Sequence, residues 1–115
     1  VGNCADPYSP KVVRSSMGAC FRLPVYETDA GGLCALLERS GIPLSATALR
    51  EDTVSLEQAR LDRAAVVIGS EGSGVSSELL SRSVQTIKIP MRERCESLNA
   101  AAAAAIVLWE MARNP

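Results

Sequence analysis

Residues 87–113 read IKIPMRERCESLNAAAAAAIVLWEMAR, and this stretch decides the fold of the chain. We expect a strand that ends at Ile89, a polar loop, and then a long helix that opens at Ser97. Alanine is the best helix former and adds almost no bulk, so a helix with six consecutive alanines can be approached closely from every side. No residue from Leu98 to Trp109 is charged. Because a surface helix shows a charged face, this pattern predicts a helix that is buried all round.

The expected buried start of this helix carries two polar side chains, Ser97 and Asn99. The first backbone N–H groups of a helix have no partners inside the helix. A helix start that adds a hydroxyl and an amide to these groups is suited to holding a ligand. We therefore expect a binding site where the helix begins.

The composition predicts a single globular domain. The chain has 115 residues, of which 47% are hydrophobic, enough apolar material for a core. The formal net charge is −1 and the pI is about 5.4. These values give no overall basic field that would attract nucleic acid. They do not exclude an enzyme with a local basic groove.

The cysteine and histidine content excludes several classes of site. The four cysteines are scattered without a C-x-x-C pair, and the chain contains no histidine. We therefore expect no metal site, and Ser-His-Asp or Cys-His catalysis is excluded for this chain alone. Scattered cysteines are typical of reduced thiols in a cytoplasmic protein. The apolar part of the last helix is too short and too interrupted to span a membrane.

The rest of the chain alternates between strand and helix patterns. Strands are expected at residues 20–26, 42–49, 64–68 and 84–89, and helices at residues 11–17, 29–39, 55–61 and 75–83. Ser9 and Ser55 are expected to cap the first and third of these helices, and Gly41 to end the second. This alternation predicts an α/β fold with a parallel sheet flanked by helices. Residues 1–3 look like the tail of a strand, so we expect a further segment upstream.

A glycine-rich loop, residues 69–74 (GSEGSG), follows a buried strand and precedes a helix, which is the usual setting of a cofactor loop. Its G-x-x-G-x-G spacing does not fit the dinucleotide fingerprint, and Val75 stands where a phosphate-binding loop needs lysine. The carboxylate of Glu71 beside exposed backbone suits a ligand of positive or mixed charge, such as S-adenosylmethionine. Glycines that merely allow a tight turn are the alternative, which the loop alone leaves open.

Three blocks of the sequence resemble the SpoU/TrmH family of RNA 2′-O-methyltransferases, in the SPOUT superfamily. They are DPYSPKVVRSSMGACFRLP at 6–24, VVIGSEGSGV at 66–75 and IPMRERCESLNAAAAAAIVLWE at 89–110. The blocks keep the family's order and spacing across nearly the whole chain. The second and third are its signature motifs and are highly specific together. The resemblance therefore favours a cofactor role for the glycine loop.

The resemblance implies a fold in which the C-terminal segment is tucked through a loop to make a deep trefoil knot. It also implies that the knot loops hold S-adenosylmethionine, and a slim alanine-rich helix is what threading under a tight loop requires. The implied cofactor contacts, mainly through backbone groups, are Gly69, Gly72, Gly74, Ile89, Met91 and Leu98. The implied catalytic positions, which line the site and position the reacting groups, are Glu71, Ser97 and Asn99.

Each catalytic candidate also has a structural alternative. Ser97 would serve as an N-cap, Asn99 as a buried amide with satisfied hydrogen bonds, and Glu71 as a charge that stabilises the following helix. We favour the functional interpretation for all three. The preference is strongest for Asn99, because an amide so early in an apolar helix is costly without a partner. Ile89 and Leu98 would be apolar in any core, so for them function and packing coincide.

The sequence departs from the family pattern in two places. The family's presumed catalytic arginine, thought to favour ionisation of the ribose 2′-hydroxyl, lies in an N-x-G-x-x-x-R block that these 115 residues do not contain. Glu93 occupies a loop position where many members have glycine. Arg14 matches an arginine common in the first block, and it is a candidate for RNA phosphate contacts together with Arg22 and Lys11. A solvated basic face is an equal alternative for these three.

The resemblance implies an enzyme that transfers a methyl group from S-adenosylmethionine to the ribose 2′-hydroxyl of ribosomal or transfer RNA. We expect these residues to be the C-terminal, knot-bearing part of its catalytic domain, to bind the cofactor, and to be nearly inactive alone. The family also implies a homodimer packed through the knot region. Three alternatives stay open: a non-catalytic knot-fold module that binds cofactor or RNA, a nucleotide-binding α/β domain, and a base-modifying relative.

Overall fold

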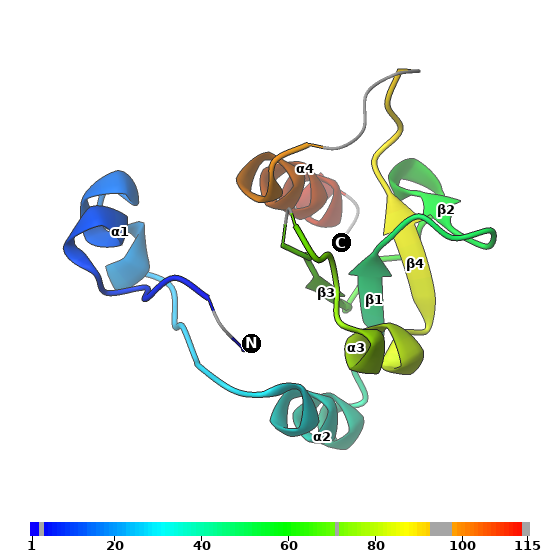
Figure 1. Ribbon diagram of the computed structural model, residues 1–115, viewed down its shortest axis with the longest axis horizontal. Helices are drawn as coiled ribbons and strands as arrows, with labels where there is room; N and C mark the ends of the chain where they lie inside the picture. The colour runs from blue at the N-terminus through cyan, green and yellow to red at the C-terminus, as the bar shows by residue number, and fades with distance from the viewer. Residues whose placement is uncertain (3, 71, 93–97, 114–115) are drawn as a thin grey trace. The chain divides into compact units, whose positions relative to one another are not determined.

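A computed structural model describes residues 1–2, 4–70, 72–92 and 98–113 (Figure 1). The chain divides into two compact units, Val1–Ala35 and Leu36–Pro115, and each is described here by itself. The expectation of a single domain stays a prediction.

The first unit begins with a short α-helix, α1 (Pro10–Ser15), followed by a 3-10 helix, η1 (Ala19–Phe21). Ser9 caps α1, since its hydroxyl oxygen accepts a hydrogen bond from the Val12 N–H at 3.4 Å. The fixed φ of Pro10 suits the first helical position. The predicted helix and its cap are therefore confirmed.

The strand predicted at residues 20–26 is wrong. The chain forms η1 there, and residues 22–26 belong to no helix or strand. Apolar and aromatic side chains at Phe21, Leu23 and Tyr26 suggested a strand, but all three are exposed. A strand is stabilised by pairing and burial rather than by an intrinsic preference of its side chains, so this composition alone misleads. Residues 1–2, expected as the tail of a strand, are also outside any strand.

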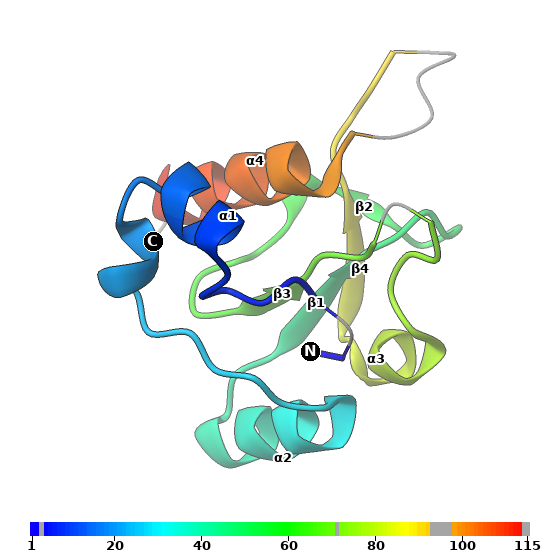
Figure 2. The same ribbon diagram turned by 60° about the vertical axis from the view of Figure 1, so that its left-hand side comes forward.

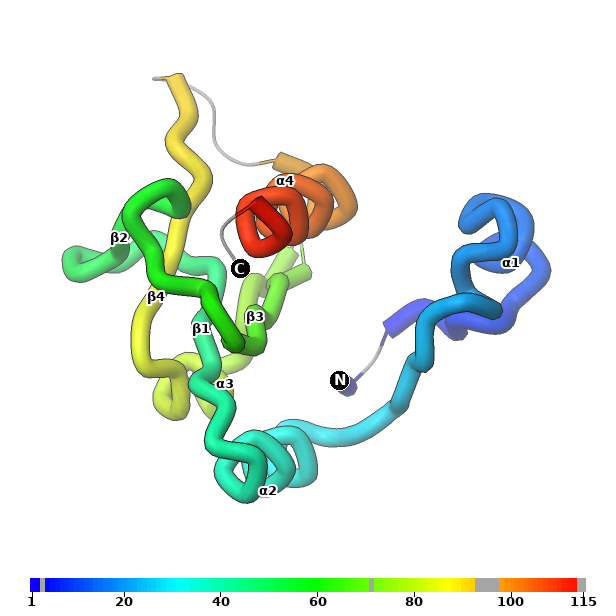
Figure 3. The backbone as a smooth tube through the Cα atoms, turned by 180° about the vertical axis from the view of Figure 1, so that it is seen from behind, coloured from blue at the N-terminus to red at the C-terminus, as the bar shows by residue number. Residues whose placement is uncertain are grey.

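The second unit is built on a four-stranded parallel sheet in the order β2-β4-β1-β3 (Figure 3). Its strands are β1 (Leu44–Thr47), β2 (Val54–Ser55), β3 (Ala65–Val67) and β4 (Gln85–Lys88). Ser45 of β1 lies opposite Val66 on one side and Gln85 on the other. The predicted parallel α/β sheet is confirmed, with shorter strands than expected.

The region around Ser55 differs from the prediction. Ser55 ends the short strand β2, and the following turn is the 3-10 helix η2 (Leu56–Gln58) rather than an α-helix. Ser55 makes no side-chain cap; its hydroxyl instead donates to the Glu57 carboxylate at 3.3 Å. Pairing with β4 accounts for the difference, because Val54 lies opposite Ile87 and holds this segment in the sheet.

Three further α-helices lie within the described residues, and all agree with the expected elements: α2 (Ala30–Ser40), α3 (Ser77–Arg82) and α4 (Ala100–Arg113). The division between the two units falls inside α2. Gly41 follows α2 with φ of +66°, a left-handed conformation that glycine adopts without a steric penalty. Ser76 caps α3 by accepting from the Leu79 N–H at 3.4 Å.

The core between the sheet and α4 is a cluster of four buried residues, Leu56, Leu61, Ile87 and Val107. Ile87 is 1% exposed and Val107 is 2% exposed, so β4 and α4 meet at the centre of this cluster. In Figure 2, α4 runs beside the upper ends of the strands, and α3 lies near their lower ends. This packing fixes the start of α4 close to the carboxyl ends of the strands.

The expectation that α4 is buried all round is wrong. Leu108 is 64% exposed and Trp109 is 69% exposed, whereas Val107 of the same helix is buried. The lack of charged residues says what the helix is made of and does not say what surrounds it. Only one stripe of α4 packs on the core. The predicted knot stays a prediction, since residues 93–97, which join β4 to α4, lie outside the described residues. Among the residues described, none of the helices is long and apolar enough to cross a membrane.

Candidate functional site

A cavity of about 210 Å³ lies at the carboxyl ends of β1, β3 and β4, beside the first turns of α4. One water molecule needs only ~10–15 Å³ by a comparable measure, so the cavity is of a size for a small organic ligand. Its described lining residues are Thr47, Ala48, Leu49, Leu56, Ile68, Gly69, Ser70, Gly74, Ile87, Lys88, Ile89, Met91, Leu98, Ala100, Ala103 and Val107. The carboxyl edge of a parallel sheet is where such folds bind ligands.

The glycine loop forms one wall of this cavity through Gly69 and Gly74. A Cβ on Gly69 would lie 2.5 Å from the backbone carbonyl carbon of Gly74, so no other residue fits there without a shift of the backbone. Gly74 has φ of +68°, and its N–H donates to the carbonyl of Ser70 at 3.0 Å. The turn is closed further by a 2.8 Å hydrogen bond between the hydroxyls of Ser70 and Ser73. A tight turn therefore explains Gly69 and Gly74.

Gly72 differs from these two glycines. A Cβ built on it meets no atom within 4 Å, its φ is not positive, and it does not line the cavity. The structure of the loop gives no internal reason for glycine at this position. Glu71, the loop's catalytic candidate, lies outside the described residues.

Thr47, the last residue of β1, joins the sheet to the glycine loop. Its hydroxyl donates to the carbonyl of Val67 at 3.3 Å and accepts from the N–H of Gly69 at 3.4 Å. Thr47 is half-buried and lines the cavity. Sequence analysis missed this residue, although its place at the end of an expected strand beside the glycine loop was a usable signal.

The helix α4 forms another wall of the cavity through Ala100, Ala103 and Val107. Asn99 precedes the helix, and its side-chain oxygen accepts from the N–H of Ala102 at 2.7 Å, which is the hydrogen bond of an N-cap. Asn99 is exposed and is not part of the cavity lining, so the expectation of a buried amide at a buried helix start is wrong. Capping gives the amide the partner that it needs. Ser97 lies outside the described residues.

Five of the six candidate cofactor residues line the cavity. These are Gly69, Gly74, Ile89, Met91 and Leu98, while Gly72 is the sixth. The two signature motifs, which are separated by 13 residues in the sequence (76–88), thus meet at one site. The candidate RNA contacts Arg14 and Arg22, and the further candidate Lys11, are exposed residues of the first unit.

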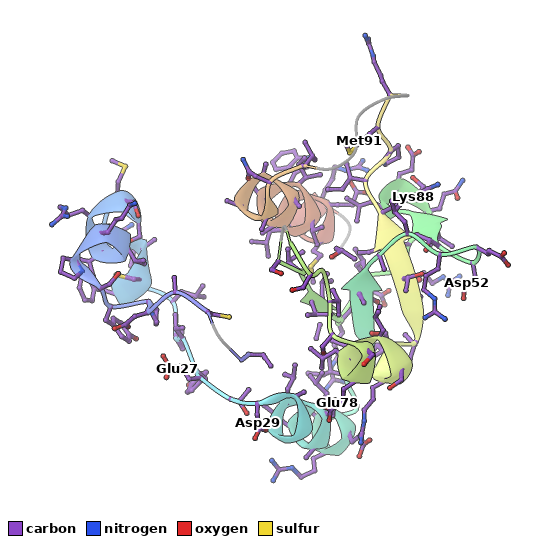
Figure 4. The ribbon with its side chains drawn as sticks, viewed as in Figure 1. Glu27, Asp29, Asp52, Glu78, Lys88 and Met91 are labelled. Atoms are coloured by element: carbon purple, nitrogen blue, oxygen red, sulfur yellow. The ribbon has the colours of Figure 1, made fainter. Side chains whose placement is uncertain are left out.

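The cavity is mainly apolar. Lys88, at the end of β4, is the one charged residue among the described lining residues, and sequence analysis missed it as well (Figure 4). Met91 lies farther along the segment that leaves β4 (Figure 4). The described part of the site has no carboxylate or imidazole to move a proton. It is suited to enclosing a ligand that has apolar ring faces and polar edges. The described residues also contain no group of three or more metal-ligating side chains.

Comparison with known proteins gives a consistent family. Residues 1–109 match the model of the SpoU rRNA Methylase family. The chain is 38% identical over 116 residues to an uncharacterized tRNA/rRNA methyltransferase of Synechocystis sp., covering 97% of this chain and 41% of that protein. It is 31% identical over 107 residues to the 23S rRNA (guanosine(2553)-2′-O)-methyltransferase RlmP of Bacillus subtilis, covering 93% of this chain and 43% of that protein.

A solved structure with bound cofactor is also similar. The SpoU methyltransferase AviRb from Streptomyces viridochromogenes, in complex with AdoMet, superimposes with a TM-score of 0.87 at 34% identity. The match covers 97% of this chain and 47% of that chain. The chain thus spans less than half the length of each of these three relatives.

Proposed function

The chain belongs to the SpoU rRNA methylase family, and from this premise we propose that it forms the S-adenosylmethionine-binding part of an RNA ribose 2′-O-methyltransferase. The observation that carries the proposal is the meeting of the two signature motifs at one cavity on the carboxyl edge of the sheet. The names of the relatives support RNA as the substrate, with ribosomal or transfer RNA as the target class.

The cavity fits the chemistry of this cofactor. Its wall combines apolar side chains such as Ile68 and Leu98, suited to the faces of an adenine ring, with the backbone of two turns, suited to its polar edge. In our proposal the backbone of Gly69, Gly74 and Ile89 holds the nucleoside, with Met91 packing on it. When bound, S-adenosylmethionine supplies a methyl group activated by a sulfonium centre.

The remaining candidate residues act on the substrate side in our proposal. Glu71, Ser97 and Asn99 position the reacting groups, and Arg14 and Arg22 contact RNA phosphates. The described lining of the cavity excludes water from the site, because its side chains are mostly apolar. Orientation and desolvation of the ribose hydroxyl supply the largest part of the rate enhancement.

Cofactor binding is tested by calorimetric titration of the chain with S-adenosylhomocysteine. Ala103 lines the cavity and Ala105 is exposed on the same helix, so an alanine-to-leucine change at each gives a matched pair. We expect Ala103→Leu to weaken binding by roughly tenfold or more, because added methyl groups occupy the cavity, and Ala105→Leu to leave it unchanged. Absence of binding by the unmodified chain would refute the proposal. Equal losses in the two variants would refute the location of the site.

Methyl transfer is tested on bulk RNA. The assay compares the 115-residue chain with a chain extended upstream by the family's N-x-G-x-x-x-R block. We expect transfer from the extended chain only. Cofactor binding without transfer by the extended chain would favour the alternative of a non-catalytic knot-fold module. Equal activity of both chains would refute the role given to the arginine.

The proposal includes two further features that the family implies, a trefoil knot at the C-terminal segment and a homodimer packed through the knot region. It also includes a cytoplasmic location, which is inferred from the scattered cysteines. Light scattering after size-exclusion chromatography tests the dimer. A single monomer peak across the concentrations used for the methylation assay would refute it.

A further inference from the structure

We propose that Thr47 is a positioning residue for the cofactor site. Its hydroxyl ties the carboxyl end of β1 to the first residue of the glycine loop, and this bond holds the backbone of Gly69 at the cavity wall. The inference rests on the proposed function, since it names S-adenosylmethionine, or its product S-adenosylhomocysteine, as the ligand whose affinity depends on the bond.

The position of Thr47 is fixed by the register of the sheet. The pairing of β1 with β3 ends where Ala46 lies opposite Val67. One residue later the hydroxyl of Thr47 donates to the carbonyl of Val67 and accepts from the N–H of Gly69. The side chain thus continues the connection between these strands beyond the last paired residues, at the point where the glycine loop begins.

Among the described residues of the glycine loop, 69–70 and 72–74, the other hydrogen bonds are internal, so this connection attaches the loop to the sheet. The N–H of Gly74 donates to Ser70, and the hydroxyls of Ser70 and Ser73 pair with each other. These bonds give the loop its shape but do not attach it to the sheet. The hydroxyl of Thr47 makes that attachment at Gly69, whose packing against the Gly74 backbone leaves no space for a side chain.

The lengths of the two hydrogen bonds decide the size of the expected effect. The N–H···O bond from Gly69 is 3.4 Å, beyond the usual range of about 2.7–3.2 Å, and the O–H···O bond to Val67 is 3.3 Å, beyond the usual range of about 2.5–3.0 Å. Thr47 therefore supports the turn without locking it. Replacing a hydroxyl of this kind changes an equilibrium by roughly 2- to 12-fold. We therefore expect Thr47→Val, which keeps the shape and removes the hydroxyl, to raise the Kd for S-adenosylhomocysteine by a factor in this range.

Thr86 supplies a matched control. It is a buried threonine of β4 whose hydroxyl lies 2.7 Å from that of Thr53, and it does not line the cavity. Because Thr86 is more buried than Thr47, Thr86→Val should destabilise the fold at least as much. A loss of affinity caused by general destabilisation would therefore appear in Thr86→Val as well.

The experiment measures the Kd for S-adenosylhomocysteine by calorimetry in the unmodified chain and in the Thr47→Val, Thr47→Ser and Thr86→Val variants. Weaker binding in Thr47→Val, rescue by Thr47→Ser and unchanged binding in Thr86→Val support the proposal. Unchanged binding in Thr47→Val, no rescue by serine, or an equal loss in Thr86→Val overturns it. Absence of binding by the unmodified chain refutes the proposed function instead.

Amide hydrogen exchange of the unmodified chain keeps the proposal testable if Thr47→Val does not fold. The Gly69 amide should exchange more slowly than the amide of the exposed residue Gly72, because it donates to Thr47. Exchange of Gly69 as fast as that of Gly72 would overturn the proposal without any variant.

Discussion

The glycine loop and the helix α4 form two walls of the same cavity, and they are built by opposite means. In the loop, backbone packs on backbone, and a Cβ at Gly69 would lie 2.5 Å from the Gly74 carbonyl carbon. In α4, small and apolar side chains face the cavity, while Leu108 and Trp109 on the same helix are exposed. The loop wall therefore depends on the identity of single residues. The helix wall depends on which stripe of the helix faces inward.

Gly69→Ala should have the largest effect on stability. The added methyl group collides with backbone that is itself held in a closed turn, and such overpacking costs about 3 kcal/mol. Urea denaturation followed by circular dichroism measures the loss. Gly72→Ala is the matched control in the same loop and should change the free energy of unfolding little, because open space surrounds that position. Similar losses in both variants would contradict the difference between the two glycines.

Val107→Ala should come next, since Val107 is 2% exposed and belongs to the core cluster that joins α4 to the sheet. Loss of two buried carbons together with the remaining cavity costs roughly 2 kcal/mol. The same denaturation experiment applies. A loss below about 0.5 kcal/mol would mean that α4 does not pack on the sheet through this stripe.

Asn99→Ala should cost about 1 kcal/mol, the typical value of a lost N-cap. Asn99→Asp separates the two roles considered for this residue, because aspartate caps a helix as well as asparagine but lacks the amide N–H donors. We expect Asn99→Asp to keep the thermal midpoint of the unmodified chain. If it also keeps full methyl transfer in the extended chain, Asn99 is a cap alone, and our proposal of a positioning role is wrong.

Leu108→Gln should have the smallest effect, within about 0.5 kcal/mol, because this side chain is 64% exposed on the outer face of α4. The measurement is thermal unfolding at a concentration where the chain is monomeric. A substantially larger loss would show that the outer face of α4 is packed, and the contrast between the two walls would then disappear.

Patterns that report backbone geometry were good guides in this chain, with Ser55 as the exception. Ser9 caps a helix, Gly41 ends one, and the glycine spacing at 69–74 marks a closed turn, because each needs a particular backbone conformation that few residues provide. The motif match also selected five residues that meet at the cavity from segments far apart in sequence. Local periodicity carries no such information.

Patterns that report only hydrophobicity located three strands of the sheet but were poor guides to burial elsewhere. The uncharged run before Trp109 suggested complete burial, and the apolar residues at 20–26 suggested a strand, but in each case side chains of that stretch are exposed. Hydrophobicity states which residues gain from burial and does not state what is available to cover them. The same reasoning missed Thr47, whose role depends on the neighbouring strand and not on its own segment.

The order of strands in the sheet has a kinetic consequence. Leu44 pairs with Ala65, and Ser45 pairs with Gln85. The inner strand β1 therefore forms its hydrogen bonds with segments that lie far along the chain. Non-local pairings of this kind slow folding, because the chain between them must be closed into a loop before the contact forms. The cavity uses the ends of β1, β3 and β4 together, so a partly folded chain cannot contain it. During refolding, ligand binding should therefore appear after the helices have formed. Its rate of appearance would measure how fast β4 joins the sheet.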